Sequence, residues 1–156
     1  MRKRRWLIPV GAVLIAAFAS AAWYLASPLF LTQTVAEGMP QGGVLLAQGG
    51  FVDGETFHKG HGMAGIYRLS DGVQVLRFEN FQVTNGPDLH VLLSANPEPR
   101  DKDGLGSFVD LGSLKGNMGE QNYLLPADFS PAVYRSVVVF CKPFQVVFSA
   151  ARLERS

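Results

Sequence analysis

Short apolar runs separated by turn residues follow one another along the chain from residue 44 onward. This pattern is typical of β-strands joined by tight turns. The clearest turn is Asp71-Gly72, which lies between two apolar runs and predicts a β-hairpin. We expect the other strands near these turns, at residues 44–52, 63–69, 73–78, 81–83, 89–93, 108–111, 123–125, 133–140 and 144–153.

After Leu31 no stretch keeps apolar residues at helical spacing for three turns. The chain from residue 44 to 156 is therefore predicted to be all-β, an antiparallel β-sandwich or a barrel-like domain. Residues 94–107 are the longest irregular stretch, and their charges predict an exposed loop.

The first 31 residues have a different pattern. A basic cluster at residues 2–5 precedes an apolar run with Trp6 near one end and Trp23 near the other. Such a run predicts one transmembrane helix over residues 1–31, with the basic end in the cytoplasm and the β domain outside it. Residues 32–43 are Gly-rich and polar, which predicts a flexible linker.

A cleaved signal peptide is the alternative for the same residues. The letters AFASAA, at residues 17–22, place small residues at the spacing of a cleavage site. In the first case the protein is held at the membrane by a single N-terminal helix, and in the second it is exported as a soluble form.

Charge argues against a nucleic-acid partner. The first five residues hold four of the 14 Lys and Arg, so 10 basic side chains face 13 acidic ones in the rest of the chain. Phosphate binding needs a basic surface, and the β domain is mildly acidic. The motifs of serine hydrolases, zinc proteases and P-loop enzymes are absent from the sequence, so a self-contained enzyme is not expected.

Cys141 is the only cysteine, and it ends the apolar run at residues 136–141. A lone cysteine is commonly a small core residue, but in an exported protein it can also stay a reactive thiol, pair between chains or bind a cofactor. No His or Met follows it, which argues against blue copper, and the spacings of covalent haem and structural zinc are missing. Haem held without a covalent link leaves no spacing signature, so the cofactor is not identified.

The histidines are the other candidate ligands. His58 and His61 are three residues apart in a Gly-rich segment, which makes them weak metal candidates, and an exposed turn is the alternative. His90 has Asp88 two residues before it, on the same face of a strand, where a carboxylate orients an imidazole. In the simplest case, Asp88 holds His90 for a structural purpose. Alternatively, Asp88 is a weak candidate for a metal ligand, or His90 lies beside Cys141 and forms a site with it.

One further segment carries polar side chains among turn residues. The letters LKGNMGEQNY, at residues 114–123, predict a loop shaped by Gly and Asn. Alternatively, its polar side chains line the rim of a pocket; these are Lys115, Asn117, Gln121 and Tyr123.

Several of these segments together resemble the DM-thirteen family, a DOMON-associated electron-transfer domain. The similarity rests on NGPDLHV, LKGNMGEQNY and CKPF, at residues 85–91, 114–123 and 141–144, and extends over residues 44–153. The resemblance implies an all-β extracytoplasmic domain that takes part in electron transfer with a redox partner protein. It also implies that Cys141 is the redox or cofactor-binding residue, with haem as a candidate cofactor. The sequence departs from the family pattern at Phe140, where a tryptophan is expected, and at Ser149, where a glycine is usual.

Three functions therefore stay open from the sequence. The first is a tethered electron-transfer domain that uses Cys141 as a thiol or with a bound cofactor. The second is a binding or adhesion module with Cys141 buried in its core, and the third is a small enzyme that depends on the thiol.

Overall fold

The structure is a computed structural model that describes residues 7–27, 31–55 and 57–156. Internal contacts divide the chain into two units, Met1–Leu31 and Thr32–Ser156. In the first unit, α1 spans Leu7–Ala26. Among the described residues, none of the helices has the length and apolar character needed to cross a membrane. The predicted transmembrane helix is therefore not supported, and the basic cluster at residues 2–5, like Trp6, lies outside the described residues.

The second unit is built from strands and one short 3₁₀ helix, which confirms the all-β prediction. Its strands form one sheet in the order β1-β7-β4-β3-β2-β9-β8-β5-β6, with β10 also paired to β2. The elements are β1 Thr34–Ala36, β2 Val44–Asp53, β3 Gly60–Arg68, β4 Gln74–Val83, β5 Leu89–Ser94, η3 Asp103–Leu105, β6 Phe108–Ser113, β7 Met118–Leu124, β8 Ser136–Cys141, β9 Val146–Arg152 and β10 Glu154–Arg155.

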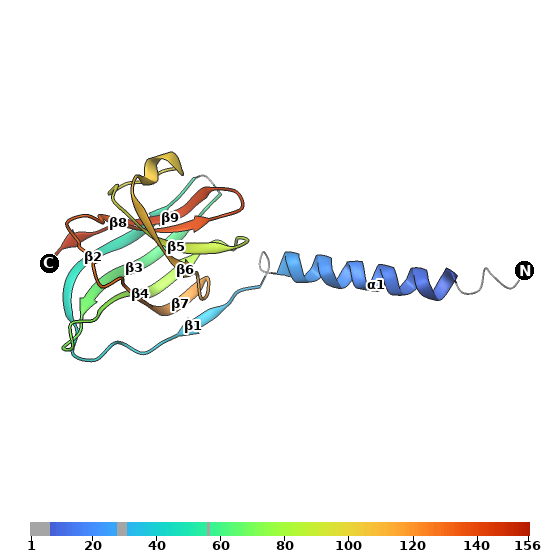
Figure 1. Cartoon of the computed structure of the whole chain (residues 1–156), viewed down its shortest axis with the longest axis horizontal. Coiled ribbons are helices and arrows are strands. Elements are labelled where there is room, and N and C mark those ends of the chain that lie inside the picture. Colours follow the sequence, from blue (N-terminus) through green and yellow to red (C-terminus); the bar gives the residue numbers. More distant parts are fainter. Residues whose placement is uncertain (1–6, 28–30, 56) are drawn as a thin grey trace, which may run out of the picture. The chain divides into compact units, whose positions relative to one another are not determined.

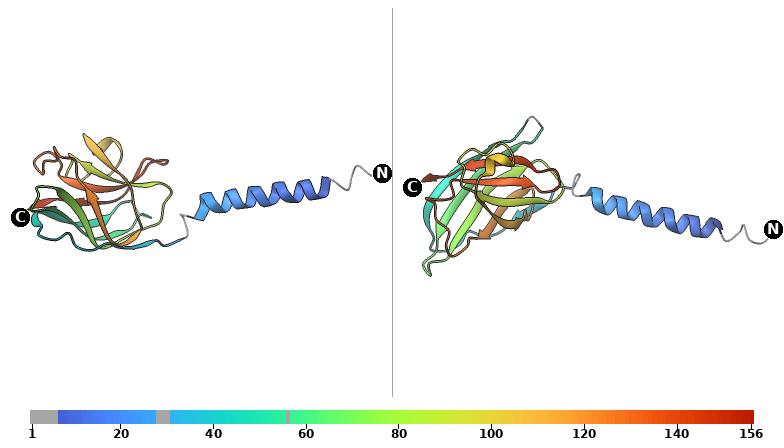
Figure 2. Two further views of the ribbon diagram at one scale, coloured as in Figure 1. Left: turned by 60° about the horizontal axis from the view of Figure 1, so that its bottom comes forward. Right: turned by 45° about the horizontal axis from the view of Figure 1, so that its top comes forward.

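The sheet curls so that its two halves face each other (Figures 1 and 2). Strand β2 belongs to both halves, because its first part pairs with β3 and its last three residues pair with β9. The main core lies between the halves and includes Phe78 of β4, Val91 of β5 and Val139 of β8. The sheet is thus a curled half-barrel, which agrees with the predicted barrel-like domain.

Sequence patterns account for the central elements. The predicted turn at Asp71-Gly72 joins β3 to β4, with Gly72 at a φ of 87° and Asp71 accepting a hydrogen bond from the N–H of Val73 at 3.0 Å. Strand β8 is a continuous run of β-branched and apolar residues and is buried on both faces. Its outward residues Val138 and Phe140 form a second, smaller core with Leu105, so the loop predicted to be exposed also covers part of the sheet.

The segment predicted to be a flexible linker contains a strand instead. Residues 34–36 form β1, which runs parallel to β7 at one end of the sheet. The loop predicted at residues 114–123 is correspondingly short, because β7 begins at Met118. Gly116 and Gly119 account for both differences. A Cβ on either glycine would overlap the backbone of residues 33–35, so the absence of a side chain leaves room for β1 to pair with β7.

Candidate functional site

Cys141 ends β8 on the inner face of the sheet. Its side chain is 0% exposed, and it belongs to the main core together with its cross-strand neighbour Leu89. The Sγ atom donates a hydrogen bond to the carbonyl oxygen of Pro87 at 3.1 Å. The exposed turn of residues 142–145 follows directly, so the thiol lies just beneath the surface of the hairpin that joins β8 to β9.

The surroundings of the thiol favour its protonated form. Burial raises the pKa of Cys141 above its ordinary value, the backbone N–H of Phe144 opposes this in part, and the Asp88 carboxylate adds to the rise. Because the thiolate is the nucleophile, a thiol held protonated at neutral pH reacts slowly. Reactivity at this site therefore requires a change in its surroundings.

His90 lies on the opposite face of the sheet from Cys141. Side chains alternate along a strand, and His90 of β5 pairs with Phe140 of β8, whereas Leu89 pairs with Cys141. Leu89 and Cys141 point into the main core, and Phe140 belongs to the outer cluster. The structure therefore does not bring together the two residues that the sequence suggested as a joint site.

The ring of His90 is held between two carboxylates. Its Nδ1 lies 2.9 Å from one oxygen of Asp110, and its Nε2 lies 3.1 Å from Asp88 and 3.4 Å from the hydroxyl of Ser113. Lys142 adds a contact of 3.2 Å to Asp110. The predicted pair of Asp88 and His90 is present, and carboxylate oxygens lie within 3.1 Å of both ring nitrogens, so the space in front of each nitrogen is already occupied.

Replacing Asp110 with asparagine is expected to lower the free energy of unfolding by about 1 to 2 kcal/mol at neutral pH. Burial raises the pKa of Asp110, but hydrogen bonds from His90, the Gly112 N–H and Lys142 outweigh it, so the pKa is lowered. A lowered pKa stabilises the fold above the ordinary value of 3.8, and this stabilisation is lost as the pH falls through the folded-state pKa.

Urea unfolding of this variant between pH 2 and 7 measures the effect. The wild type should lose stability more steeply below pH 4 than Asp110→Asn, while the exposed Asp128→Asn should follow the wild type. Parallel curves for the wild type and Asp110→Asn would show that the His90 cluster does not bind protons differently on unfolding.

The candidate metal ligands are not gathered into a site. The ring of His58 stacks on Phe148 at 3.9 Å between centroids, while His61 is exposed on β3, opposite Gln82. Asp88, the third candidate, is bonded to His90. Within the part of the chain that the structure describes, no three His, Cys, Asp or Glu side chains form a group that could hold a metal ion.

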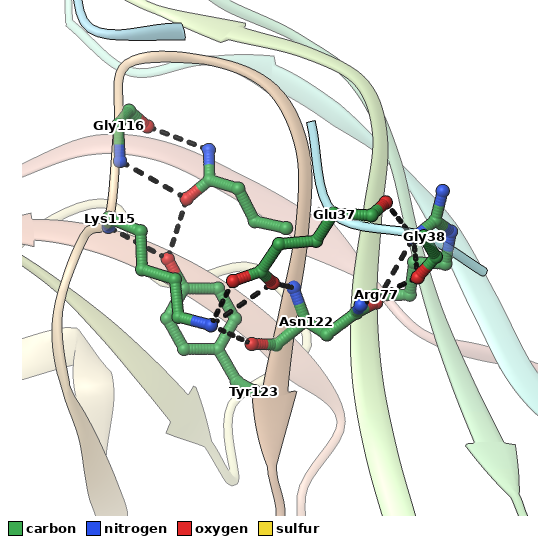
Figure 3. Close-up of polar contacts among 8 residues, drawn as sticks. Glu37, Gly38, Arg77, Lys115, Gly116, Asn122 and Tyr123 are labelled. Carbon is green, nitrogen blue, oxygen red and sulfur yellow. Dashed lines mark hydrogen bonds and ion pairs between the residues drawn. The ribbon is translucent and has the colours of Figure 1, made fainter. Parts of the chain in front are cut away.

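The polar residues predicted at a pocket rim bond to one another and to the backbone, and Figure 3 shows the contacts of two of them, Lys115 and Tyr123. Gln121 is 0% exposed, donates to the Gly116 carbonyl at 2.7 Å and accepts from the hydroxyl of Tyr123 at 2.7 Å. Burial raises the pKa of Tyr123 to about 12, so its hydroxyl stays a donor. Lys115 bonds Glu37 at 2.7 Å, and Asn117 accepts from the backbone N–H of Gln33 at 2.7 Å.

Sequence reasoning missed several members of this network, among them Glu37, Arg77 and Asn122. Arg77 is 6% exposed on β4 and bonds Asn122 as well as the backbone of residues 37 and 38. The signal available in the sequence was an arginine between the apolar residues Leu76 and Phe78, since an arginine is almost never fully buried unless it is paired.

Sequence reasoning also missed a pocket of about 480 Å³ over the ends of β2 and β9. Its lining includes the apolar Val52, Val147 and Ala150 together with charged residues from the 97–101 loop. The pairing of β2 with β9 brings these segments together, and no local pattern in the sequence reports that pairing.

Comparison with known families identifies the β unit. The family model described as Electron transfer DM13 matches residues 51–153, which is well over half of the chain. Searches of curated proteins and of solved structures give no match. The description of the family supports a general role in electron transfer or redox chemistry. The match includes Cys141 and every strand from β3 to β9, and the chain therefore belongs to the Electron transfer DM13 family.

Proposed function

We propose that this domain takes part in electron transfer outside the cytoplasm and that the thiol of Cys141 is its redox group. The observation that carries the proposal is the position of the chain's only cysteine directly beneath an exposed turn, within the region that matches the family. Opening of residues 142–145 would uncover the sulfur without dismantling the sheet.

The step that fits a single thiol is exchange with a disulfide of a redox partner protein. The Cys141 sulfur, after losing its proton to solvent, attacks one sulfur of that disulfide, whose S–S bond breaks as a mixed disulfide forms. The leaving thiolate takes up a proton, and a thiolate of a second redox protein, a dithiol donor, then attacks the Cys141 sulfur, so that the first partner leaves with both of its sulfurs as thiols. The second thiol of the donor attacks the new mixed disulfide, forms the donor's own disulfide and releases Cys141 as a thiol. Two electrons thus pass from the dithiol donor to the disulfide partner without any cofactor in this domain.

A haem bound through the predicted residues does not fit the arrangement. The sulfur of Cys141 is enclosed by core side chains, where a macrocycle would need open space. His90 faces the other side of the sheet and has carboxylates at both ring nitrogens. The two residues cannot ligate one haem from these positions, so no step of the proposal uses one.

The location outside the cytoplasm is supported by the N-terminal sequence alone. The basic cluster at residues 2–5 followed by an apolar run fits either a membrane anchor or an export signal. The partner is a redox protein rather than a nucleic acid, because the β domain is mildly acidic.

Replacing Cys141 with serine is expected to abolish formation of a mixed disulfide with oxidised glutathione, which is detected as an added mass on the intact protein. The same change should lower the free energy of unfolding by about 1 to 3 kcal/mol, because a hydroxyl is more costly to bury than a thiol. Val139→Ala is the matched control, since it weakens the same core but keeps the thiol. A wild type that acquires no glutathione under native conditions would contradict the proposal.

The second candidate function is a binding module, and the pocket over β2 and β9 favours it. Its volume lies in the range of small-molecule sites, and its lining combines apolar residues with charged side chains. In that case Cys141 acts only in the core, and Cys141→Ser would alter stability without altering binding. An Ala150→Trp variant, which fills the pocket, would then lose ligand binding while its thiol behaves as in the wild type.

A further inference from the structure

Residues 33–38 lie along β7 as a docked extended segment. The pairing is parallel, with Val35 opposite Gly119. At one end the Met118 N–H donates to the Gln33 carbonyl at 3.2 Å, and at the other the Glu37 N–H donates to the Glu120 carbonyl at 3.0 Å. The segment is thus held by its backbone over its whole length.

The surface that receives this segment is shaped for a backbone. Gly119 has a φ of 95°, and a Cβ added to it would overlap the Val35 carbonyl oxygen. A Cβ on Gly116 would likewise overlap the carbonyl oxygen of Gln33. The two glycines therefore do more than form a turn, because they open the space that the strand occupies.

A carboxylate socket lies at one end of this surface (Figure 3). Lys115 Nζ lies 2.7 and 3.0 Å from the two carboxylate oxygens of Glu37, and the Asn122 N–H donates to one of them at 2.6 Å. Lys115 is itself positioned by the Asn122 carbonyl, at 2.7 Å, and by the ring of Tyr123. The hydrogen bond from Lys115 is the main reason why the pKa of Glu37 is lowered.

Next to the socket, the Arg77 side chain, 7% exposed, contacts the backbone of the segment. Its Nη1 donates to the carbonyls of Glu37 and Gly38, each at 3.2 Å. The side chain of Asn122 adds a bond of 2.9 Å to the same Gly38 carbonyl. A buried arginine aimed at main-chain carbonyls recognises an extended segment largely independently of its side chains.

The receiving surface and the segment differ in their position relative to the family match. The surface, consisting of residues 115–123 with Arg77, lies within the region that matches the family, whereas residues 33–38 precede that region. Strand β1 has three residues, and the chain that connects it to β2, residues 37–43, is rich in glycine and mostly exposed. Such a short element on an extended connection is suited to exchange between copies.

We propose that the surface of residues 115–123 with Arg77 is a binding site for an extended segment carrying a glutamate. In this structure it is filled by residues 33–38 of its own chain. The same segment of a second copy fills it when the chain's own segment is displaced, which links two copies by exchanged strands.

Two full-length variants test the exchange by complementation. Glu37→Lys places a cation against Lys115, so the segment of this variant no longer binds the surface. Gly119→Val places a side chain where the backbone of the segment lies, so the surface of this variant no longer accepts a segment. Each variant alone should give no exchanged pair, and a mixture should give a 1:1 complex by native mass spectrometry, because one chain has a sound surface and the other a sound segment. Mixing Gly119→Val with the double variant Glu37→Lys/Gly119→Val is the control, since both surfaces are then blocked.

A labelled peptide of residues 32–39 provides a second measurement that does not depend on Gly119→Val folding. The Glu37→Lys chain should bind this peptide, the wild type should not, and a peptide with glutamine in place of the glutamate should bind about tenfold more weakly. The proposal is overturned if the mixture forms no more complex than its control and the Glu37→Lys chain does not bind the peptide. Equal binding of the glutamate and glutamine peptides would overturn the carboxylate socket.

Discussion

Replacing Arg77 with methionine is expected to lower the free energy of unfolding by about 3 kcal/mol. The guanidinium bonds Glu79 and Glu120, each at 2.9 Å, from a side chain that is 7% exposed. Methionine keeps much of the apolar stem but leaves these carboxylates without their cation, and they are only partly open to water. The loss of a buried charge that satisfies several partners costs far more than the loss of a surface ion pair.

Urea unfolding of the full-length protein, followed by circular dichroism, measures this effect. Arg152→Met is the matched control, because Arg152 bonds Glu98 at 2.8 Å but both side chains are more than half exposed. Its effect should be less than about 1 kcal/mol. Arg77→Lys separates charge from shape, since an ammonium cannot reach all the partners of the planar guanidinium, and it should retain only part of the stability. Equal effects of Arg77→Met and Arg152→Met would contradict the role assigned to the network.

The sequence allowed the β fold to be predicted where the pattern is local. The hairpin at Asp71-Gly72 and the buried strand β8 could each be predicted from a few neighbouring residues. Turn residues determine the hairpin, and a continuous apolar run indicates a strand buried on both faces. The three-residue β1 carries no such signal. Its position depends on Gly116 and Gly119, more than 80 residues later, and these glycines are equally typical of a turn.

The candidate site shows the same limit. The contact of Asp88 with His90 was predicted from strand alternation and is present, but Asp88 lies in the turn just before β5, at a φ of 47°, so the turn and not the alternation places its carboxylate beside the ring. Whether His90 lies near Cys141 depends on the register between β5 and β8, and a shift of one residue would reverse the answer. The register between β5 and β8 depends on the packing of the whole sheet, so it cannot be predicted from the sequence of either segment alone.

Labelling of Cys141 by a small thiol reagent is expected to be at least about a hundredfold slower than labelling of an exposed cysteine in the same turn. The exposed reference is Phe144→Cys in a Cys141→Ser background, because Phe144 is 69% exposed and only three residues away. Two causes act together, since the sulfur is enclosed in the core and burial raises the pKa of its thiol.

The dependence of this rate on urea separates the two candidate functions. If the turn of residues 142–145 opens by itself, little surface is exposed, and the labelling rate should be nearly constant at low urea concentrations. We expect this result, because a redox thiol must be reached while the sheet stays folded. A rate that rises with the full urea dependence of global unfolding would show that Cys141 is reached only in the unfolded chain. Thiol exchange with a partner would then be excluded, and the pocket over β2 and β9 would become the better candidate for function.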